Sequence, residues 1–519
     1  MKKQLALLLA ALLAALSLSA CGAAETPAAN VAVAAGDPAV PEETTHPDAI
    51  VIAIESEPTT LNPYDHAAVV SGYMNQLTYN RLFRLNIDTL EPEPELAESF
   101  EALDDVTWVF RLRQGVLFHD GTEMTAEDVK ASMEYARQFT SSNRYTSFWT
   151  DVTVNDKYTL TVTTDGPYAL ILNDLASNGN TVVPKSLIDA GNDFNQNPIG
   201  TGPYKFVSWT LGDNLTFVKN DDYFDRDHMP TITDLTWRVI PEGSSRTIAL
   251  ESGEVDLIVD VSSTDVDRLR AKEEVTVEEV EGTRFNFMAL NNEKAPFDNV
   301  LVRRAINCLV DKQAVIEVAA NGQGAVCTGM LASPFPGVTD EGADEHNVSL
   351  ALSLFEQAGV DPTQLSFTCM AYTDATRRAA EVIQGCLFEA GITMDIESLD
   401  FAAWLSRLLE GDYETAIAGY SSSDVLTCIK GMWHSSSINA ANSARISDPE
   451  LDALIDRAQQ TIDEDARLAL IRQVSVRLNQ ACPVVPLYTS SVIRAFDSRL
   501  GGADVSASGL MRWQDLRWQ

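Results

Sequence analysis

The stretch EPELAESFEALDDVTWVFRLRQGVLFHDGTEMTAEDVKASMEYA, residues 93–136, joins a strand pattern to a helix pattern through a turn. Apolar and polar residues alternate over 107–113, as expected of a half-buried strand. A helix is expected over 125–139, because Thr125 is a good N-cap and Asp128, three positions on, completes a capping box. Acidic residues in its first turn also favour the positive end of the helix dipole.

Strand and helix patterns alternate along the rest of the chain. The expected strands cover 50–56, 215–220, 234–241, 365–372 and 484–496, with a further strand ending the block 197–209 and a hairpin over 151–165. The expected helices cover 69–83, 377–392, one long helix over 300–319, and two helices within 448–480 that begin with an Asp448 N-cap. The alternation after residue 284 predicts an α/β lobe.

The N-terminus has the pattern of a signal peptide. Two lysines precede an apolar run, Leu5–Leu16, of only 12 residues, which is too short to span about 30 Å of hydrocarbon at ~1.5 Å per residue. Leu18-Ser19-Ala20-Cys21 resembles the bacterial lipobox, which implies cleavage before Cys21 and lipid attachment to its thiol. The alternative is a simple cleaved signal with a chance cysteine.

The segment that follows predicts a flexible tether over 21–46. It is rich in Ala, Pro and Thr and has no apolar period, so it cannot bury enough surface to order itself. The first globular pattern, DAIVIAIESEP, begins near Asp48. The sequence therefore predicts a folded protein held by a flexible tether at the outer face of the bacterial cytoplasmic membrane, in the periplasm or at the cell surface.

Length and charge narrow the class of protein. Removing 20 signal residues from 519 leaves 499, too many for one core, so two or more lobes are expected. The 75 acidic against 37 basic residues give a net charge of −38, spread along the chain. Nucleic acid would be repelled at long range, so no nucleic-acid partner is expected, and the charge itself identifies no ligand.

Seven cysteines leave two alternatives open. They are Cys21, Cys308, Cys327, Cys369, Cys386, Cys428 and Cys482. If Cys21 carries lipid, the other six allow 15 disulfide pairings, which an exported protein permits; free buried thiols are the alternative. No CxxC is present, so neither a zinc knuckle nor a thioredoxin-like site is indicated.

No pattern for catalysis is found. The six histidines form no HExxH, and no GxSxG elbow is present. His119-Asp120 with Glu123 is better explained as a turn before a capped helix than as a metal site. GTGPY, residues 200–204, leads into a strand, so it is a turn rather than a phosphate loop. We expect no catalytic residue, no metal site, no cofactor and no enzyme activity.

Four blocks in order resemble family 5 of the bacterial extracellular solute-binding proteins, the peptide and nickel receptors of ABC importers. The blocks are 93–136, 197–209, 290–316, and 446–459 followed by 482–488. The resemblance covers the chain from about Asp48 to its C-terminus. It is specific for the family and much less specific for the ligand.

The resemblance implies an α/β fold of the two-lobed periplasmic-binding-protein type II (cluster C), with an extra subdomain inserted in the first lobe. Two crossover strands, near 283–291 and 483–488, would form the hinge, and the lobes would close over the ligand. The implied boundaries are 47–285 plus 485–519 for lobe I, roughly 88–200 for the inserted subdomain, and 286–484 for lobe II.

The resemblance also implies an amine anchor. In dipeptide receptors of the family, an aspartate that follows a Gly-Trp turn late in the second lobe takes the ligand's α-amino group. The comparable stretch here is 413–436, where Gly419-Tyr420 replaces Gly-Trp and Asp424 is the nearby acid. Such a pair gains strength when closure lowers the dielectric. Asp424 equally suits the N-cap of a helix beginning near Val425.

Other expected contacts are less specific. The family's carboxylate-binding arginine has no clear counterpart, because Arg377 and Arg378 align with the helix after the second-lobe strand. Aromatic side chains are candidate walls that could equally belong to the core, and His434 could meet a chelated metal. These ligand-contact candidates are Tyr64, Tyr145, Tyr372, Trp404, Trp433 and His434.

The sequence therefore predicts a monomeric peptide-binding lipoprotein that works with ABC permease and ATPase subunits and is held at the membrane by its lipid. Within the same family, the alternatives are a receptor for a nickel chelate, glutathione or an opine. From other classes, the alternatives are a peptide-sensing surface receptor without transport and a surface hydrolase, which the absence of catalytic motifs opposes.

Overall fold

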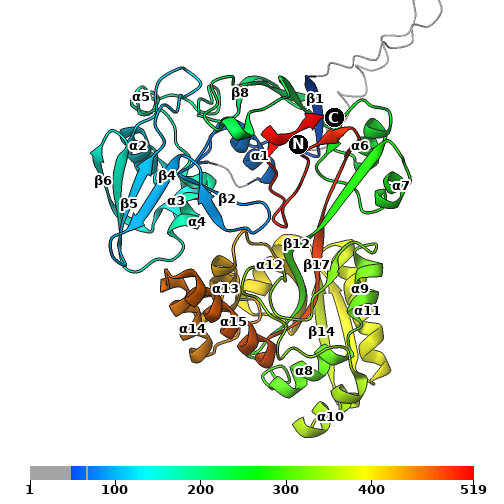
Figure 1. Cartoon of the computed structure of the whole chain (residues 1–519). Helices are drawn as coiled ribbons and strands as arrows, with labels where there is room; N and C mark the ends of the chain where they lie inside the picture. Colours follow the sequence, from blue (N-terminus) through cyan, green and yellow to red (C-terminus); the bar gives the residue numbers. More distant parts are fainter. Residues whose placement is uncertain (1–47, 66–67) are drawn as a thin grey trace, which may run out of the picture. The chain divides into compact units, whose positions relative to one another are not determined.

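Two long antiparallel strands, β12 (Val275–Leu290) and β17 (Val484–Asp497), form the centre of the largest sheet (Figure 1). The computed structural model describes residues 48–65 and 68–519. The predicted signal peptide, the lipidation site Cys21 and the tether therefore lie outside the described residues. Pairing of β12 with β17 runs from Val275 opposite Asp497 to Ala289 opposite Val484.

The large sheet has the order β15-β14-β16-β12-β17-β11-β1-β10-β9-β8. On one side of the central pair lie β14 (Ser366–Ala371), β15 (Thr393–Ser398) and β16 (Thr415–Tyr420). On the other side lie β1 (Ala49–Ile54), β8 (Tyr204–Thr210), β9 (Asn214–Lys219), β10 (Asp234–Val239) and β11 (Leu257–Ile258). The short strand β13 (Ala325–Val326) also pairs with β17. Parallel and antiparallel pairs are mixed, as the predicted α/β class allows.

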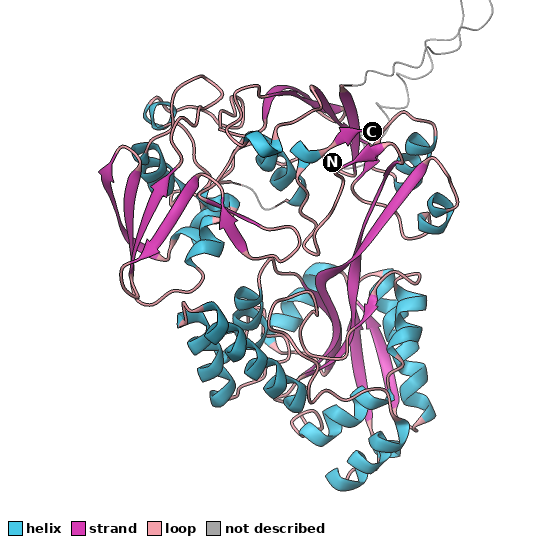
Figure 2. Ribbon diagram, viewed as in Figure 1, coloured by secondary structure: helices cyan, strands magenta, loops and turns pink. Residues whose placement is uncertain are grey.

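A separate four-stranded antiparallel sheet has the order β4-β5-β7-β6 (Figure 2). Its strands are β4 (Ala97–Ala102), β5 (Thr107–Leu112), β6 (Trp149–Asp156) and β7 (Thr159–Thr164). Helix α2 (Ala126–Ala136) packs on it through a core that includes Phe110 and Met133. The capping box predicted at Thr125 is present, since Asp128 Oδ2 accepts a 2.8 Å hydrogen bond from the Thr125 backbone N–H.

Further helices surround these sheets. They are α1 (Val69–Thr78), α3 (Thr140–Thr146), α4 (Ile171–Leu175), α5 (Lys185–Asp189), α6 (Gly243–Glu251), α7 (Val266–Arg270), α10 (Val348–Ala358), α11 (Asp374–Glu389), α12 (Phe401–Glu410) and α13 (Val425–Trp433). The two helices predicted within 448–480 are confirmed as α14 (Pro449–Gln460) and α15 (Glu464–Ala481). Asp448 caps α14, as predicted, by accepting hydrogen bonds from Glu450 and Leu451 N–H.

Two helix predictions are corrected. The single helix expected over 300–319 is wrong: α8 (Val300–Leu309) and α9 (Lys312–Ala319) are separate. Val310 is extended and Asp311 begins a new helix, its carboxylate accepting a 3.0 Å hydrogen bond from Ala314 N–H. Likewise α1 ends at Thr78 rather than near residue 83, because Tyr79 is extended. The next strand, β2 (Phe83–Leu85), pairs with β3 (Pro92–Pro94).

The two ends of the described chain pack together. Trp518 Nε1, near the C-terminus, donates a 2.9 Å hydrogen bond to the Ala49 carbonyl at the start of β1. The Trp513 ring lies 4.7 Å from that of Trp237 and 5.4 Å from that of Tyr73, centroid to centroid. Segments from opposite ends of the sequence thus share one core, which agrees with a discontinuous first lobe; the predicted lobe boundaries stay a prediction.

Candidate functional site

A cavity of about 890 Å³ lies where β12, β17 and the segment after β16 meet residues that precede and begin α4. The two long central strands contribute residues 282–284 of β12 and 490–494 of β17, so the sheet topology determines which side chains meet there. Its charged and aromatic lining includes Tyr145, Asp174, Arg284, Tyr420, Asp424 and Arg494. A cavity of this size suits a small solute enclosed on several sides.

A second cavity, of about 280 Å³, shares part of this lining. Tyr145, Asp174, Ser423, Asp424 and Ser508 border both spaces. The smaller space extends to β2 and to the segment before β4, where Arg84 and Glu95 lie. The shared residues place Asp424 at the junction of the two spaces.

Asp424 is the N-cap of α13. Its Oδ1 accepts a 2.7 Å hydrogen bond from Thr427 N–H, so the cap alternative raised by the sequence is confirmed. Burial raises the pKa of this carboxyl group, and the capping hydrogen bonds partly offset that effect. The amine-anchor role stays a prediction, and the position of Asp424 at both cavities is compatible with it.

The residues just before Asp424 lie next to the guanidinium group of Arg284. Tyr420 borders the larger cavity, whereas Gly419 is not among the residues that line it. A Cβ atom on Gly419 would lie 2.9 Å from Arg284 Nη2 and 2.9 Å from Asn286 Oδ1. Gly419 therefore makes room for the Arg284 side chain, which is the part it plays in the site.

Arg284 is a site residue that the sequence analysis missed. It is exposed, borders the larger cavity, and its Nη1 donates a 3.3 Å hydrogen bond to Ser421 Oγ. Within the described residues it forms no ion pair. A signal was available: polar Arg284 and Asn286 alternate with Phe285 and Phe287, both buried in a core, so the arginine had to face away from that core.

The aromatic candidates have different surroundings. Tyr145 borders both cavities. Tyr64 is fully buried, donates a 2.8 Å hydrogen bond to the Thr181 carbonyl and packs on Phe139. It borders neither cavity. Trp433, 1% exposed, is also a core side chain.

Tyr372 and Trp404 form an aromatic pair with ring centroids 4.4 Å apart. Trp404 is buried in a core, while Tyr372 is half-buried against the same core. Neither side chain borders the two cavities described above. Their ligand contacts stay predictions that the cavity does not support.

His434 has a structural environment. It is buried, its Nδ1 accepts a 3.0 Å hydrogen bond from Ser436 N–H, and its Nε2 lies 3.3 Å from Asp456 Oδ1. The described residues contain no group of three or more His, Cys, Asp or Glu side chains able to hold a metal. Glu123 is engaged by Lys157 and Tyr158, in line with the turn interpretation of its segment.

The six described cysteines are free thiols, so the disulfide alternative is not the one adopted. Burial raises the pKa of Cys308 to about 11 and that of Cys369 to about 12. Cys386 is half-buried, and burial raises its pKa as well, while a backbone hydrogen bond at Asp311 opposes that effect. None of these thiols therefore has the lowered pKa of a reactive cysteine.

These features define the class of protein: a mixed α/β solute-binding protein with a cavity between distant parts of the chain. The chain belongs to family 5 of the bacterial extracellular solute-binding proteins, whose middle-region model matches residues 91–439. No helix in the described ranges is both long and apolar enough to cross a membrane.

Two named relatives cover most of the chain. Heme-binding protein A of Haemophilus influenzae is 28% identical over 465 residues, covering 82% of this chain and 84% of that protein. Glutathione-binding protein GsiB of Salmonella paratyphi A is 24% identical over 500 residues, covering 93% and 95%. Both names describe binding proteins rather than enzymes.

Solved structures share the fold. HbpA2 from Haemophilus parasuis has a TM-score of 0.84 at 24% identity, covering 91% of this chain and all of that one. The periplasmic binding protein DppA from Helicobacter pylori, in complex with the peptide STSA, has a TM-score of 0.72 at 25% identity, covering 91% and 98%. The fold is thus that of the two-lobed periplasmic binding proteins, as predicted from the sequence.

Proposed function

We propose that this protein is the substrate-binding lipoprotein of an ABC importer and that it captures short peptides. The observation that carries the proposal is that an aspartate, Asp424, and a cation, Arg284, border the same cavity of about 890 Å³. A peptide with free ends carries an ammonium group and a carboxylate, so each end would meet the opposite charge. Such charge-assisted hydrogen bonds are among the stronger polar contacts in proteins.

Arg284 would bind the peptide's carboxylate in place of the family's arginine, which has no clear counterpart at Arg377 or Arg378. Arg377 ion-pairs with Asp374 and Glu381 on α11, and Arg378 donates to the Val318 and Ala319 carbonyls. Both are therefore engaged outside the cavity. Arg284, in contrast, borders the cavity. Gly419 leaves room for its side chain, and Ser421 accepts one of its hydrogen bonds.

Two of the similar proteins support a peptide ligand. One solved neighbour holds a peptide, and glutathione, named for a relative, is itself a peptide derivative. No observation in the described residues favours a nickel chelate, because His434 is buried and lies beside Asp456. An opine is the second candidate for the same pair of charges, since another solved neighbour, AgaA, holds agropinic acid. A sensing role without transport and a hydrolase have no support among the described residues.

The lipid on Cys21 completes the proposal. A receptor that feeds a permease benefits from a tether, because the tether raises its effective concentration at the transporter. The family resemblance implies a diacylglycerol anchor, and two acyl chains hold a protein at a membrane far more firmly than one. The folded monomer would then deliver its peptide to the permease and ATPase subunits.

Ligand identification tests the proposal. The body without residues 1–21 is unfolded and refolded to remove carried ligand, and its thermal unfolding is followed with trialanine, N-acetyl-trialanine, trialanine amide, glutathione and nickel–histidine. At 100 times Kd a ligand adds about 2.7 kcal/mol of stability. We expect a shift with trialanine that weakens when either end is blocked. A shift with nickel–histidine alone would overturn the proposal.

A variant pair connects the result to the site. Arg284→Gln removes the cation from the cavity, and Arg226→Gln removes an exposed arginine that borders neither cavity. We expect Arg284→Gln alone to weaken trialanine binding. Equal trialanine affinities of the two variants would show that Arg284 takes no part in peptide binding.

A further inference from the structure

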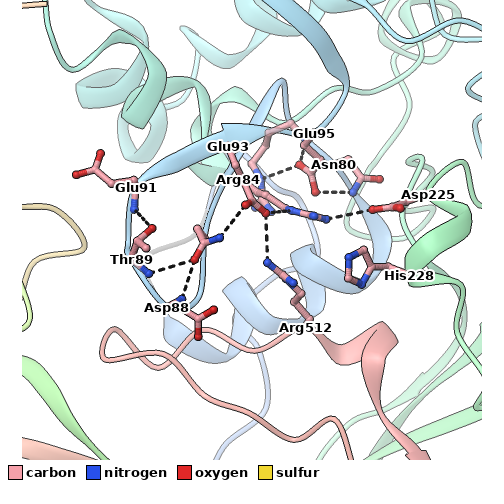
Figure 3. Close-up of polar contacts among 12 residues, drawn as sticks. Asn80, Arg84, Asp88, Thr89, Glu91, Glu93, Glu95, Asp225, His228 and Arg512 are labelled. Atoms are coloured by element: carbon pink, nitrogen blue, oxygen red, sulfur yellow. Dashed lines mark hydrogen bonds and ion pairs between the residues drawn. The ribbon is translucent and has the colours of Figure 1, made fainter. Parts of the chain in front are cut away.

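The smaller cavity, of about 280 Å³, has more basic side chains than the larger one. Arg81, Arg84 and Arg512 border it, together with the acids Glu95, Asp174 and Asp424. Figure 3 shows that Arg84, Glu93 and Arg512 converge beside the segment from β2 to β3. The question is which of these guanidinium groups has donors left for a ligand.

Arg84 is held by two protein carboxylates. Its Nε donates a 2.7 Å hydrogen bond to Glu93 Oε1 and its Nη1 a 3.3 Å hydrogen bond to Asp225 Oδ2 (Figure 3). This arginine therefore belongs to the wall of the pocket and organises the acidic groups around it.

Arg81 is in a different position. Its side chain is 10% exposed, Nη1 donates to Asn178 Oδ1, and Nε is buried without a hydrogen-bond partner. Glu95 lies 3.7 Å from that Nε, but its oxygens already accept from Asn80 Nδ2 and from the Arg81 backbone N–H, each at 2.8 Å. Nη2, in contrast, donates no hydrogen bond within the described residues and is not fully enclosed. It is therefore the donor that an acceptor from a ligand in the cavity can reach.

Arg512 is in a similar position. Its Nη2 donates a 3.3 Å hydrogen bond to Glu93 Oε1, the atom that also accepts from Arg84 (Figure 3). Its Nε is enclosed, whereas its Nη1 is not enclosed and donates no hydrogen bond within the described residues. Two arginines that border one small cavity thus each retain a terminal N–H donor that a ligand can reach.

We infer that this cavity is a subsite for the carboxylate of an acidic side chain at the first residue of the bound peptide. The inference rests on the proposed function. Asp424 lies at the junction of the two spaces, so an ammonium group held there sends the first side chain into the smaller cavity. The remaining backbone then runs into the larger one, toward Arg284. A carboxylate is the acceptor that guanidinium groups bind with the best geometry.

Matched peptides test the subsite. The affinity of the refolded body is measured by calorimetry for Glu-Ala-Ala, Gln-Ala-Ala, Ala-Ala-Glu and Ala-Ala-Gln. We expect Glu-Ala-Ala to bind about tenfold more tightly than Gln-Ala-Ala. The acid should have no comparable benefit at the third residue, because that side chain lies outside the pocket.

Variants assign the preference to the two arginines. Arg81→Gln and Arg512→Gln should each reduce the preference for Glu-Ala-Ala over Gln-Ala-Ala while retaining binding of Ala-Ala-Gln. Glu95 keeps both of its hydrogen bonds in Arg81→Gln, since neither comes from the replaced side chain. Arg512→Gln provides a second route if the buried substitution prevents folding, and Arg226→Gln is the control expected to behave as the wild type.

The outcomes separate two levels of failure. Equal binding of Glu-Ala-Ala and Gln-Ala-Ala, or a preference that persists in both variants, overturns the subsite and leaves peptide capture intact. Failure of all four peptides to bind overturns peptide capture and the subsite together. A preference at the third residue would overturn the proposed orientation of the peptide.

Discussion

The backbone of Gly419 and the guanidinium of Arg284 occupy adjoining space: a Cβ atom on Gly419 would lie 2.9 Å from Arg284 Nη2. These residues belong to β16 and β12, which pair so that Asn286 lies opposite Gly419. The glycine thus allows an arginine from the central strand to reach the cavity. Ser421, two residues further on, accepts a hydrogen bond from the same side chain.

Gly419→Ala should therefore displace Arg284 and weaken peptide binding by about 1.5–3 kcal/mol, the range for a charge-assisted hydrogen bond. Calorimetry with trialanine and its C-terminal amide measures the effect, and the amide should be little affected. Gly385→Ala is the control, because a Cβ atom there meets nothing within 4 Å. Unchanged trialanine affinity in Gly419→Ala would contradict the role of Arg284.

Asp424→Asn separates the anchor from the cap. Asparagine is about as good an N-cap as aspartate, so the melting temperature should hardly change. If Asp424 takes the peptide's amine, affinity should fall by about 2–5 kcal/mol. Asp424→Ala should in addition lose about 0.5–2 kcal/mol of stability through the missing cap. An Asn variant that binds as well as the wild type would leave Asp424 as a cap alone.

The raised pKa of Asp424 predicts the sign of a pH effect on binding. An ammonium group binds the ionised carboxylate, so affinity should fall as pH drops through the raised pKa. Binding should then release a proton, since the ammonium group lowers that pKa again. Calorimetry in two buffers of different ionisation enthalpy measures the release, which Asp424→Asn should abolish.

In the unliganded protein, the raised pKa of Asp424 predicts that stability changes with pH in the direction opposite to affinity. Its folded-state value lies above the unfolded one, so the contribution of Asp424 to stability is present below the unfolded pKa and lost as pH rises through the folded pKa. The loss should be absent in Asp424→Asn. Urea unfolding of the wild type and of Asp424→Asn, measured from below the unfolded pKa to above the folded pKa, gives the two unfolding free energies to compare.

The thiol assignment predicts the order of alkylation. In the body without residues 1–21, iodoacetamide should label Cys386 first, because it is half-buried while the other five described cysteines are buried. Raised pKa values, about 12 for Cys327 and Cys482, further slow their reaction. Mass spectrometry of native and unfolded samples follows the labelling, with Cys386→Ser as control. A disulfide-linked peptide in a nonreducing digest would refute the free-thiol state.

Cys21→Ser should release the full-length protein from membranes. A lipid can be attached only to the thiol, and the rest of the proposed anchor depends on it. Fractionation of cells that express each form, with antibody detection, measures the membrane-bound share. Retention of the serine variant in the membrane fraction would count against lipidation.

Local patterns predicted elements well where one short-range effect dominates. The capping box at Thr125 and the Asp448 cap lie where the sequence placed them. The prediction over 300–319 was wrong because its apolar pattern continues through Asp311, a cap residue that starts a second helix. Periodicity does not register such a break when both helices bury side chains in the same core.

The sequence by itself determined the family and the α/β class, because these depend on ordered motifs and on neighbours a few residues away. It left Asp424 open between an N-cap and an amine anchor, and the structure confirmed the cap. Only the tertiary structure decided which side chains meet at the cavities. Arg284 and Ser421 are 137 residues apart in sequence, and Arg512 and Glu93 are 419 apart. Strand pairing and the return of the C-terminal segment bring such residues together, and neither leaves a periodic signal around the individual residue.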